Sequence, residues 1–183
     1  MKISIVKAWN FLVLFSFHIV CAQHQSNIRL DGVPGLNKPN GDSIICFFPV
    51  ALGVGTKATS AFGTRLHPTL NKVHWHNGID IAGQRGSPVY AAGYGRVADC
   101  GFKTDIGYFV AIEHPHSYTT VYGHLTSYSV LPGTPVEGGT EIGRIGSTGR
   151  STGPHLHFTV KKGARSVDPV PILLRALSFH NIK

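Results

Sequence analysis

Short segments in which apolar and polar residues alternate dominate the chain from about residue 60 onward. Alternation at every second position is typical of strands that bury one face. Glycine and proline separate nearly all of these segments, and no amphipathic helix of useful length precedes Pro169. We therefore expect strands at residues 95–100, 108–114, 118–124, 141–145 and 155–160, a short apolar segment at 88–92, and an early strand within the apolar run at 44–54.

The end of the chain has a different pattern. Residues 170–177 are mostly apolar and lack glycine, and Pro171 suits the first turn of a helix. We expect a short closing helix there. The whole pattern predicts a mainly β fold, with one antiparallel β domain whose edges fold over a groove.

The first 22 residues have the composition of a signal peptide. Two lysines precede an apolar stretch, and Val20-Cys21-Ala22 leads to a predicted cleavage before Gln23. A lipoprotein attached through Cys21 is the alternative, although Val20 is bulkier than the residue that usually precedes a lipidated cysteine. We expect a periplasmic or secreted protein that is not stably inserted in a membrane after cleavage.

Composition adds limits on size and partners. The chain has 183 residues, 42% of them hydrophobic, which suits one domain with short extensions. Residues 23–59 begin with a polar, turn-rich stretch and are interpreted as an arm or linker. The net charge of +8 would suit an anionic polymer, but the longest basic run is Lys161-Lys162, so we expect no nucleic acid partner.

Cys46 and Cys100 form either a disulfide or two thiols, and the sequence leaves both open.

Histidine is the residue type that carries candidate chemistry. Eleven histidines occur, and several are spaced two apart, which places both imidazoles on one face of a strand. One four-coordinate ion cannot take all of these pairs, so their neighbours must distinguish them. The three pairs are His74/His76, His114/His116 and His155/His157.

The His155/His157 pair lies on the predicted strand that is best anchored by core packing. His155, His157 and Thr159 share one face of residues 155–160, while the intervening apolar residues face a core. A strand fixed by packing gives a metal site the rigidity it needs. By contrast, Pro115 lies between His114 and His116, and we interpret that pair as a solvated turn.

A second group combines an imidazole with a carboxylate. His76 and Asp80 are four residues apart, with Gly78 between them, and an even spacing keeps both on one side of an extended segment. Two histidines and one carboxylate leave the fourth zinc position open for water, as in catalytic sites. His124 ends the segment 118–124, where it shares a face with Tyr118, Thr120 and Tyr122 if the strand is regular.

Together these residues resemble peptidase family M23, the lysostaphin-like or LytM-type zinc metallopeptidases. The resemblance runs from about residue 60 to residue 160, and its ordered combination of motifs is specific although each motif alone is not. The motifs are FGTRLHP at 62–68, HNGIDIA at 76–82, GSPVYAA at 86–92, VYGHL at 121–125 and GSTGRSTGPHLHF at 146–158.

The resemblance implies a two-layer antiparallel β domain with an open groove, extending over residues 60–168 and followed by a tail at 169–183. It implies one Zn²⁺ per chain, held by His76, Asp80 and His157. It also implies that His124 and His155 are catalytic residues that do not bind the metal, without deciding which one is the general base. The extra histidine His74 departs from the family pattern, and we exclude it because Gly78 and Asp80 keep register with His76.

The activity that the resemblance implies is hydrolysis of peptide bonds in peptidoglycan stem peptides or cross-bridges, by a monomer, for wall remodelling or lysis. Two alternatives belong to other classes. One is a non-catalytic M23-like, wall-binding regulator of an amidase, which would be expected to lack a ligand. The other is an exported protein that stores metal, which would bind more than one ion and would not need His124.

Overall fold

The computed structural model describes residues 45–51, 56–66 and 73–180, without the side chains of residues 65, 66, 74 and 177–180. The predicted signal peptide at 1–22, with Cys21, lies outside the described residues, as do Gln23 and His67. Within the described part no helix has the length and apolar character needed to cross a bilayer.

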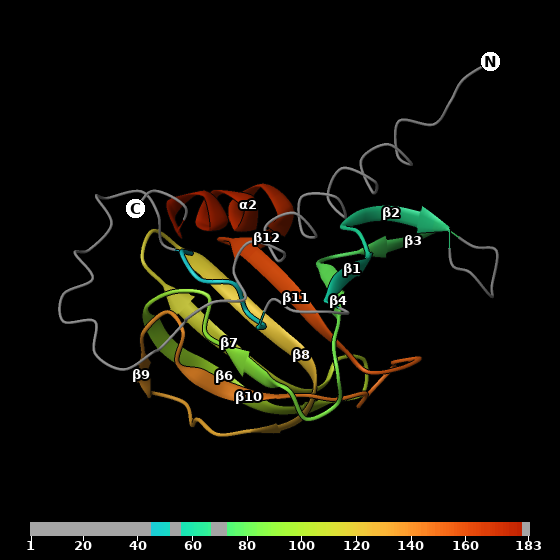
Figure 1. Cartoon of the computed structure of the whole chain (residues 1–183), viewed down its shortest axis with the longest axis horizontal. Coiled ribbons are helices and arrows are strands. Elements are labelled where there is room, and N and C mark those ends of the chain that lie inside the picture. The colour runs from blue at the N-terminus through green and yellow to red at the C-terminus, as the bar shows by residue number, and fades with distance from the viewer. Residues whose placement is uncertain (1–44, 52–55, 67–72, 181–183) are drawn as a thin grey trace, which may run out of the picture.

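The described chain is mostly β, and it ends in one helix (Figure 1). The main sheet is antiparallel, and its longest path has the order β1-β4-β11-β8-β7-β6-β9, with β10 pairing β5 and β8, and β12 pairing β11. A separate ribbon pairs β2 with β3. The elements are β1 (Lys57–Ser60), β2 (Gly63–Leu66), β3 (Val73–His76), β4 (Ile79–Ala82), β5 (Pro88–Tyr90), β6 (Gly95–Lys103), β7 (Gly107–His114), β8 (Tyr118–Tyr128), β9 (Pro135–Val136), β10 (Glu141–Ile145), β11 (His155–Lys162), β12 (Arg165–Val167) and α2 (Pro169–His180).

The predicted fold class is confirmed: the chain is mainly β and antiparallel, with one short C-terminal helix. All five strands expected from residue 95 onward form, and β6, β8 and β11 extend beyond their expected ends. The described part of the expected early strand, residues 45–51, makes only the isolated bridge Val50–Val89. The strands that the pattern did not reveal are four residues long or shorter, too short for alternation to be recognised.

The core lies between the sheet and the segments that cover it. Leu156 and Phe158 of β11 are fully buried, and Leu173 of α2 is buried beside them. Phe48, from the segment expected to be an arm, is also buried in this core. The predicted boundaries at residues 22, 59 and 168 stay predictions.

One prediction about the core is wrong. His114, expected in a solvated turn, is 7% exposed, because β7 continues through it and the turn begins after it. Its Nδ1–H donates to the Tyr94 carbonyl at 2.7 Å, and its Nε2 lies 2.8 Å from the Thr120 hydroxyl. Burial lowers the pKa of His114, so the ring is neutral at pH 7. His116, with a φ of 56°, is exposed as expected.

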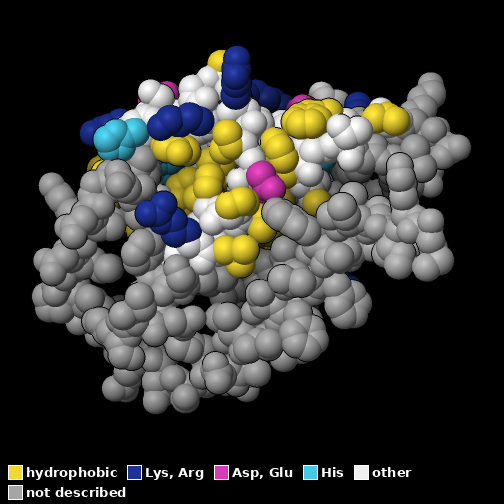
Figure 2. All heavy atoms as spheres, turned by 90° about the horizontal axis from the view of Figure 1, so that it is seen from above, with side chains coloured by type: hydrophobic (Ala, Val, Ile, Leu, Met, Phe, Trp, Pro, Cys, Tyr) yellow, Lys and Arg dark blue, Asp and Glu magenta, His cyan; other side chains and the backbone are white. Residues whose placement is uncertain are grey.

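The face that carries α2 is shown in Figure 2, where hydrophobic side chains lie in the centre and Lys and Arg side chains lie mainly to the left and above. Leu174 of α2 is 37% exposed.

The two cysteines that the sequence left open are free thiols, both half-buried. The Cys100 thiol donates to the Val130 carbonyl at 3.5 Å. Burial raises the pKa of the Cys46 thiol, so it is the protonated form that packs against the domain.

Candidate metal centre

Two neighbouring antiparallel strands bring the candidate carboxylate and one candidate imidazole together. In the register of β4 and β11, His157 lies directly opposite Asp80, and Phe158 lies opposite Ile79. Side chains alternate between the two faces of a sheet. The Phe158 and Ile79 side chains therefore fill the core, while His157 and Asp80 share the opposite face.

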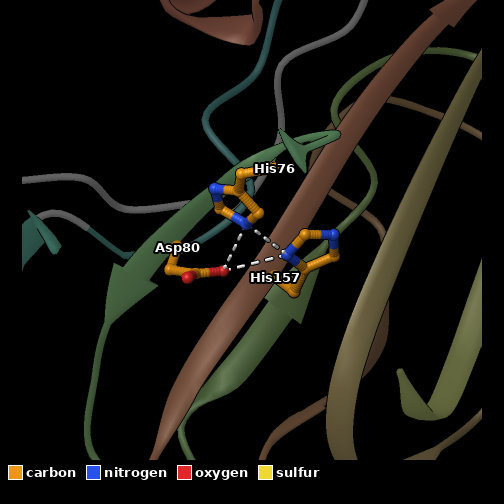
Figure 3. Close-up of side chains that lie close together, drawn as sticks. All are labelled: His76, Asp80 and His157. Carbon is orange, nitrogen blue, oxygen red and sulfur yellow. Dashed lines mark hydrogen bonds and ion pairs between the residues drawn. The ribbon is translucent and has the colours of Figure 1, made fainter. Parts of the chain in front are cut away.

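The second imidazole comes from the end of β3. His76 is followed by a tight turn, in which a Cβ on Gly78 would lie 2.4 Å from the Phe158 carbonyl oxygen. Glycine is therefore required for the turn to pack against β11. This turn brings His76 back towards Asp80, and Figure 3 shows the three side chains pointing at one another.

Their facing atoms are spaced as ligands of one ion. His157 Nδ1 lies 2.9 Å from Asp80 Oδ1, His76 Nε2 lies 3.1 Å from His157 Nδ1, and His76 Nε2 lies 3.2 Å from Asp80 Oδ1. Tetrahedral zinc with bonds of about 2.0–2.1 Å places neighbouring ligand atoms about 3.3–3.4 Å apart. As whole residues, all three are at most 9% exposed. Among the described residues, this is the group of histidines, cysteines and acids that could hold a metal ion.

Hydrogen bonds at the far side of each ring determine which nitrogen faces the centre. The Nδ1–H of His76 donates to the Ala61 carbonyl at 2.8 Å, so its Nε2 carries a lone pair. His157 Nε2 lies 3.1 Å from both Asn77 Oδ1 and the Thr159 hydroxyl, which suits a proton on Nε2 and a lone pair on Nδ1. Two lone pairs and a carboxylate oxygen that converge in this way repel one another unless a cation lies between them, so the donor set fits zinc.

The carboxylate is ionised. Burial by itself raises the pKa of Asp80, but the His157 and His76 rings, which donate hydrogen bonds to the carboxylate when no cation lies between them, outweigh it and hold the pKa well below its usual range. A carboxyl group must lose its proton to bind a metal, and this one has already done so at neutral pH.

Two further imidazoles lie beside this group. The His124 ring centroid is 4.6 Å from that of His155 and 5.7 Å from that of His157. His155 Nε2 lies 3.6 Å from Asp80 Oδ1. The Nδ1–H of His155 donates to the Gly153 carbonyl at 2.8 Å, and that of His124 donates to the Thr148 carbonyl at 2.7 Å. Both rings therefore direct Nε2 away from these carbonyls.

His124 reaches the centre by a route that a regular strand would not allow. Tyr122 lies opposite Phe158 and packs against it in the core, so a regular β8 would also direct His124 into the core. The shared face was expected only for a regular strand, and β8 is not regular at His124. His124 has a φ of 59°, and the pairing with β7 slips between residues 122 and 125, so a bulge rotates the ring to the other face. Burial lowers the pKa of His124, which keeps the ring neutral at pH 7.

The structure thus brings together all five residues that the sequence singled out: His76, Asp80, His124, His155 and His157. The side chain of His74 lies outside the described residues. Sequence reasoning missed the groups that orient the rings, above all Asn77 and Thr148. Among these groups, only Thr159 was indicated by the sequence, because alternation placed it on the same face as His157.

Comparison with known proteins gives consistent matches. The profile of peptidase family M23 matches residues 74–169. The chain is 43% identical to the DD-carboxypeptidase/endopeptidase Mpg of Neisseria meningitidis over 121 residues, which cover 66% of this chain and 28% of Mpg. Two solved structures have a TM-score of 0.61 with it. A zinc-containing peptidase from Vibrio cholerae is 41% identical over 66% of this chain and 37% of its own. The catalytic domain of the antimicrobial peptidase lysostaphin from Staphylococcus simulans is 30% identical over 65% of this chain and 92% of its own.

Proposed function

The chain belongs to peptidase family M23, and on this premise we propose that it is an exported zinc metalloendopeptidase that hydrolyses peptide bonds in peptidoglycan. The observation that carries the proposal is the convergence of His76 Nε2, His157 Nδ1 and Asp80 Oδ1, at 2.9–3.2 Å from one another, beside two further imidazoles. His76, Asp80 and His157 hold one Zn²⁺, and His124 and His155 act on the substrate.

A bound zinc ion would act as a Lewis acid that polarises the scissile carbonyl and lowers the pKa of water. The water could then lose a proton at neutral pH and attack the carbonyl. The residues of the chain do the rest. Asp80 brings a negative charge that offsets part of the charge of the ion. Ala61, Asn77 and Thr159 hold the ring protons of the two liganding histidines on their far nitrogens, which keeps both facing nitrogens free.

His124 and His155 provide the acid–base groups. In each ring the Nδ1–H donates to a carbonyl, so each Nε2 can take a proton from the attacking water or stabilise the developing oxyanion once protonated. Their centroids are 4.6 Å apart, so both can reach the same reacting atoms. A protein that only stores metal would gain nothing from this pair.

The substrate class follows from the relatives. Mpg is named for activity on DD bonds, and we propose that this chain cuts such a bond in stem peptides or their cross-links. The chain spans about a quarter of the length of the curated relatives it matches, so this assignment concerns the shared domain. The basic chain would be attracted to anionic wall polymer, in the periplasm or outside the cell, and is expected to act as a monomer.

The test is digestion of purified wall of two defined chemistries, one with directly cross-linked stems and one with glycine bridges, followed by mass spectrometry of the new termini. We expect cleavage of the directly cross-linked wall, loss of activity on chelation, and recovery when zinc is restored. A His76→Ala variant should be inactive, whereas His116→Ala, which removes an exposed imidazole from a turn, should be as active as the wild type.

The same experiment separates the enzyme from the regulator. Wild-type protein that binds zinc and wall but releases no new termini would contradict the proposal. If it then stimulated a wall amidase, the non-catalytic function would replace it.

A further inference from the structure

The loop between β10 and β11 contacts both imidazoles that lie outside the predicted ligand set. It accepts the His155 proton at Gly153 and the His124 proton at Thr148. Gly153 has no side chain, whereas the Thr148 hydroxyl also bonds the loop to the neighbouring strands. We propose that Thr148 is a positioning residue that determines which nitrogen of His124 carries the proton. The consequence for catalysis rests on the proposed function, but the consequence for the ring does not.

The Thr148 hydroxyl is bound on two sides. It donates to the Leu125 carbonyl at 2.7 Å, and it accepts the Tyr108 N–H at 3.0 Å. Leu125 follows His124 in β8, and Tyr108 lies opposite Leu125 in β7, so both bonds join the loop to the bulge that rotates His124. The hydroxyl therefore holds the Thr148 carbonyl in place relative to the ring that donates to it.

Packing leaves the loop little freedom. Gly107, with a φ of 65°, faces Thr148 so closely that an added Cβ would lie 2.2 Å from Thr148 Oγ1. Gly149, with a φ of 71°, lies equally close to Gly107, and an added Cβ there would lie 2.3 Å from the Gly107 nitrogen. Two glycines in left-handed conformations thus let the loop contact the β6–β7 turn directly. The Arg150 N–H donates to Asp105 in the same turn at 3.0 Å.

The position of the Thr148 carbonyl determines whether the His124 Nε2 that faces the metal centre carries a lone pair or a proton. A neutral imidazole has one ring proton. With that proton donated to Thr148, Nε2 carries a lone pair and can accept a proton. If the carbonyl moves away, the tautomer with the proton on Nε2 gains population, and that tautomer cannot accept a proton there. His155 has its own partner at Gly153, so its ring should not change.

The test compares Thr148→Val, which removes the hydroxyl while preserving the shape, with Thr148→Ser, which restores it. Thr140→Val is the matched control, because it removes a hydroxyl that accepts a backbone N–H at 3.1 Å in another turn. Zinc content, ring ¹⁵N resonances and steady-state kinetics are measured on zinc-loaded full-length protein. The kinetic substrate is a soluble cross-linked muropeptide dimer, and the His124 signals are assigned by their loss in His124→Gln.

We expect Thr148→Val to keep its zinc, to lose the Nδ1–H signature of His124 and to retain that of His155. Its kcat should fall about 10- to 100-fold, with KM within about twofold, because displacing a reacting group by about 1 Å costs up to about 100-fold. Thr148→Ser and Thr140→Val should resemble the wild type in both measurements. If Thr148→Val does not fold, the smaller Thr148→Ala removes the same hydroxyl without adding a methyl group and should give the same two changes.

Each of the two measurements, the Nδ1–H signature of His124 and kcat, can overturn the proposal. An unchanged Nδ1–H signature in the folded variant shows that Thr148 does not position the ring, even if the rate falls. A changed signature with an unchanged kcat shows that the position of the proton has no role in the reaction. If the wild type cuts no wall at all, the proposed function fails, while the ¹⁵N measurement still decides whether Thr148 orients His124.

Discussion

Replacing His157 by alanine should abolish tight zinc binding, whereas the same change at His155, two residues earlier, should leave it intact. The two imidazoles lie on the same face of β11, so the sequence alone does not separate them. Their distances do. His157 Nδ1 lies 2.9 Å from Asp80 and 3.1 Å from His76, whereas His155 Nε2 lies 3.6 Å from Asp80 and is outside the group of three mutually close ligand atoms.

The size of the effect follows from the number of ligands. Protein zinc sites with four ligands bind with roughly 10–16 kcal/mol at pH 7, or about 2.5–4 kcal/mol for each ligand. Loss of His157 should therefore raise the Kd for zinc by about two to three orders of magnitude. It also leaves the buried Asp80 without its nearest partner, which adds to the loss. For His155→Ala we expect a change of less than about threefold.

The assay is competition for zinc with a chromogenic chelator, on protein freed of metal and reloaded. His74→Ala is the matched control, since it removes a histidine two residues before His76 and should bind zinc like the wild type. Tight binding in His157→Ala together with loss of binding in His155→Ala would show that the assignment of the pair is reversed. Loss of binding in His74→Ala would overturn the choice of His76.

Four other outcomes are expected. His124→Ala and His155→Ala should each keep zinc and lose about 10²- to 10⁴-fold in the rate of wall hydrolysis, with the double variant little worse, as measured by release of labelled fragments; a near wild-type rate in either would remove its catalytic role. Zinc occupancy after dialysis should fall below about pH 6, because the imidazoles must be neutral to bind, and full occupancy at about pH 5 would contradict this. Burial lowers the pKa of His114 from 6.5, so the unfolded chain takes up the proton first and the free energy of unfolding should fall as the pH drops below 6.5. His114→Gln should flatten this dependence in urea titrations, and an unchanged slope would show that another group is responsible. N-terminal sequencing of exported protein should give Gln23, and a lipidated Cys21 would instead place the chain at a membrane surface.

Local pattern was sufficient for the strand that carries the second half of the site. The alternation of residues 155–160 predicted that Leu156 and Phe158 face the core while His157 faces away, and both apolar residues are fully buried. This works because the period of two is a property of the strand backbone itself. The five longest strands, the antiparallel class and the closing helix followed from the same kind of local signal.

Long-range pairing decided whether those side chains meet. His157 and Asp80 are 77 residues apart in the chain, and they lie side by side only because β4 and β11 pair in one register. A slip of one residue would move Asp80 to the core face, and no local pattern in either segment excludes it. The burial of Phe158 opposite Ile79 selects the register, and that selection is a tertiary effect.

His124 and His114 show where local pattern fails. Alternation along residues 118–124 assigns His124 to the face of Tyr122, but the bulge in β8 turns it to the face of His157. Pro115 suggested a solvated turn, yet His114 is buried because Tyr94 and Thr120, from other strands or turns, satisfy both ring nitrogens. The sequence by itself therefore singled out the five candidate residues and predicted the strands that hold His124, His155 and His157. Only the tertiary structure decided which atoms face one another, because bulges, register and buried hydrogen bonds depend on partners that are distant in the chain.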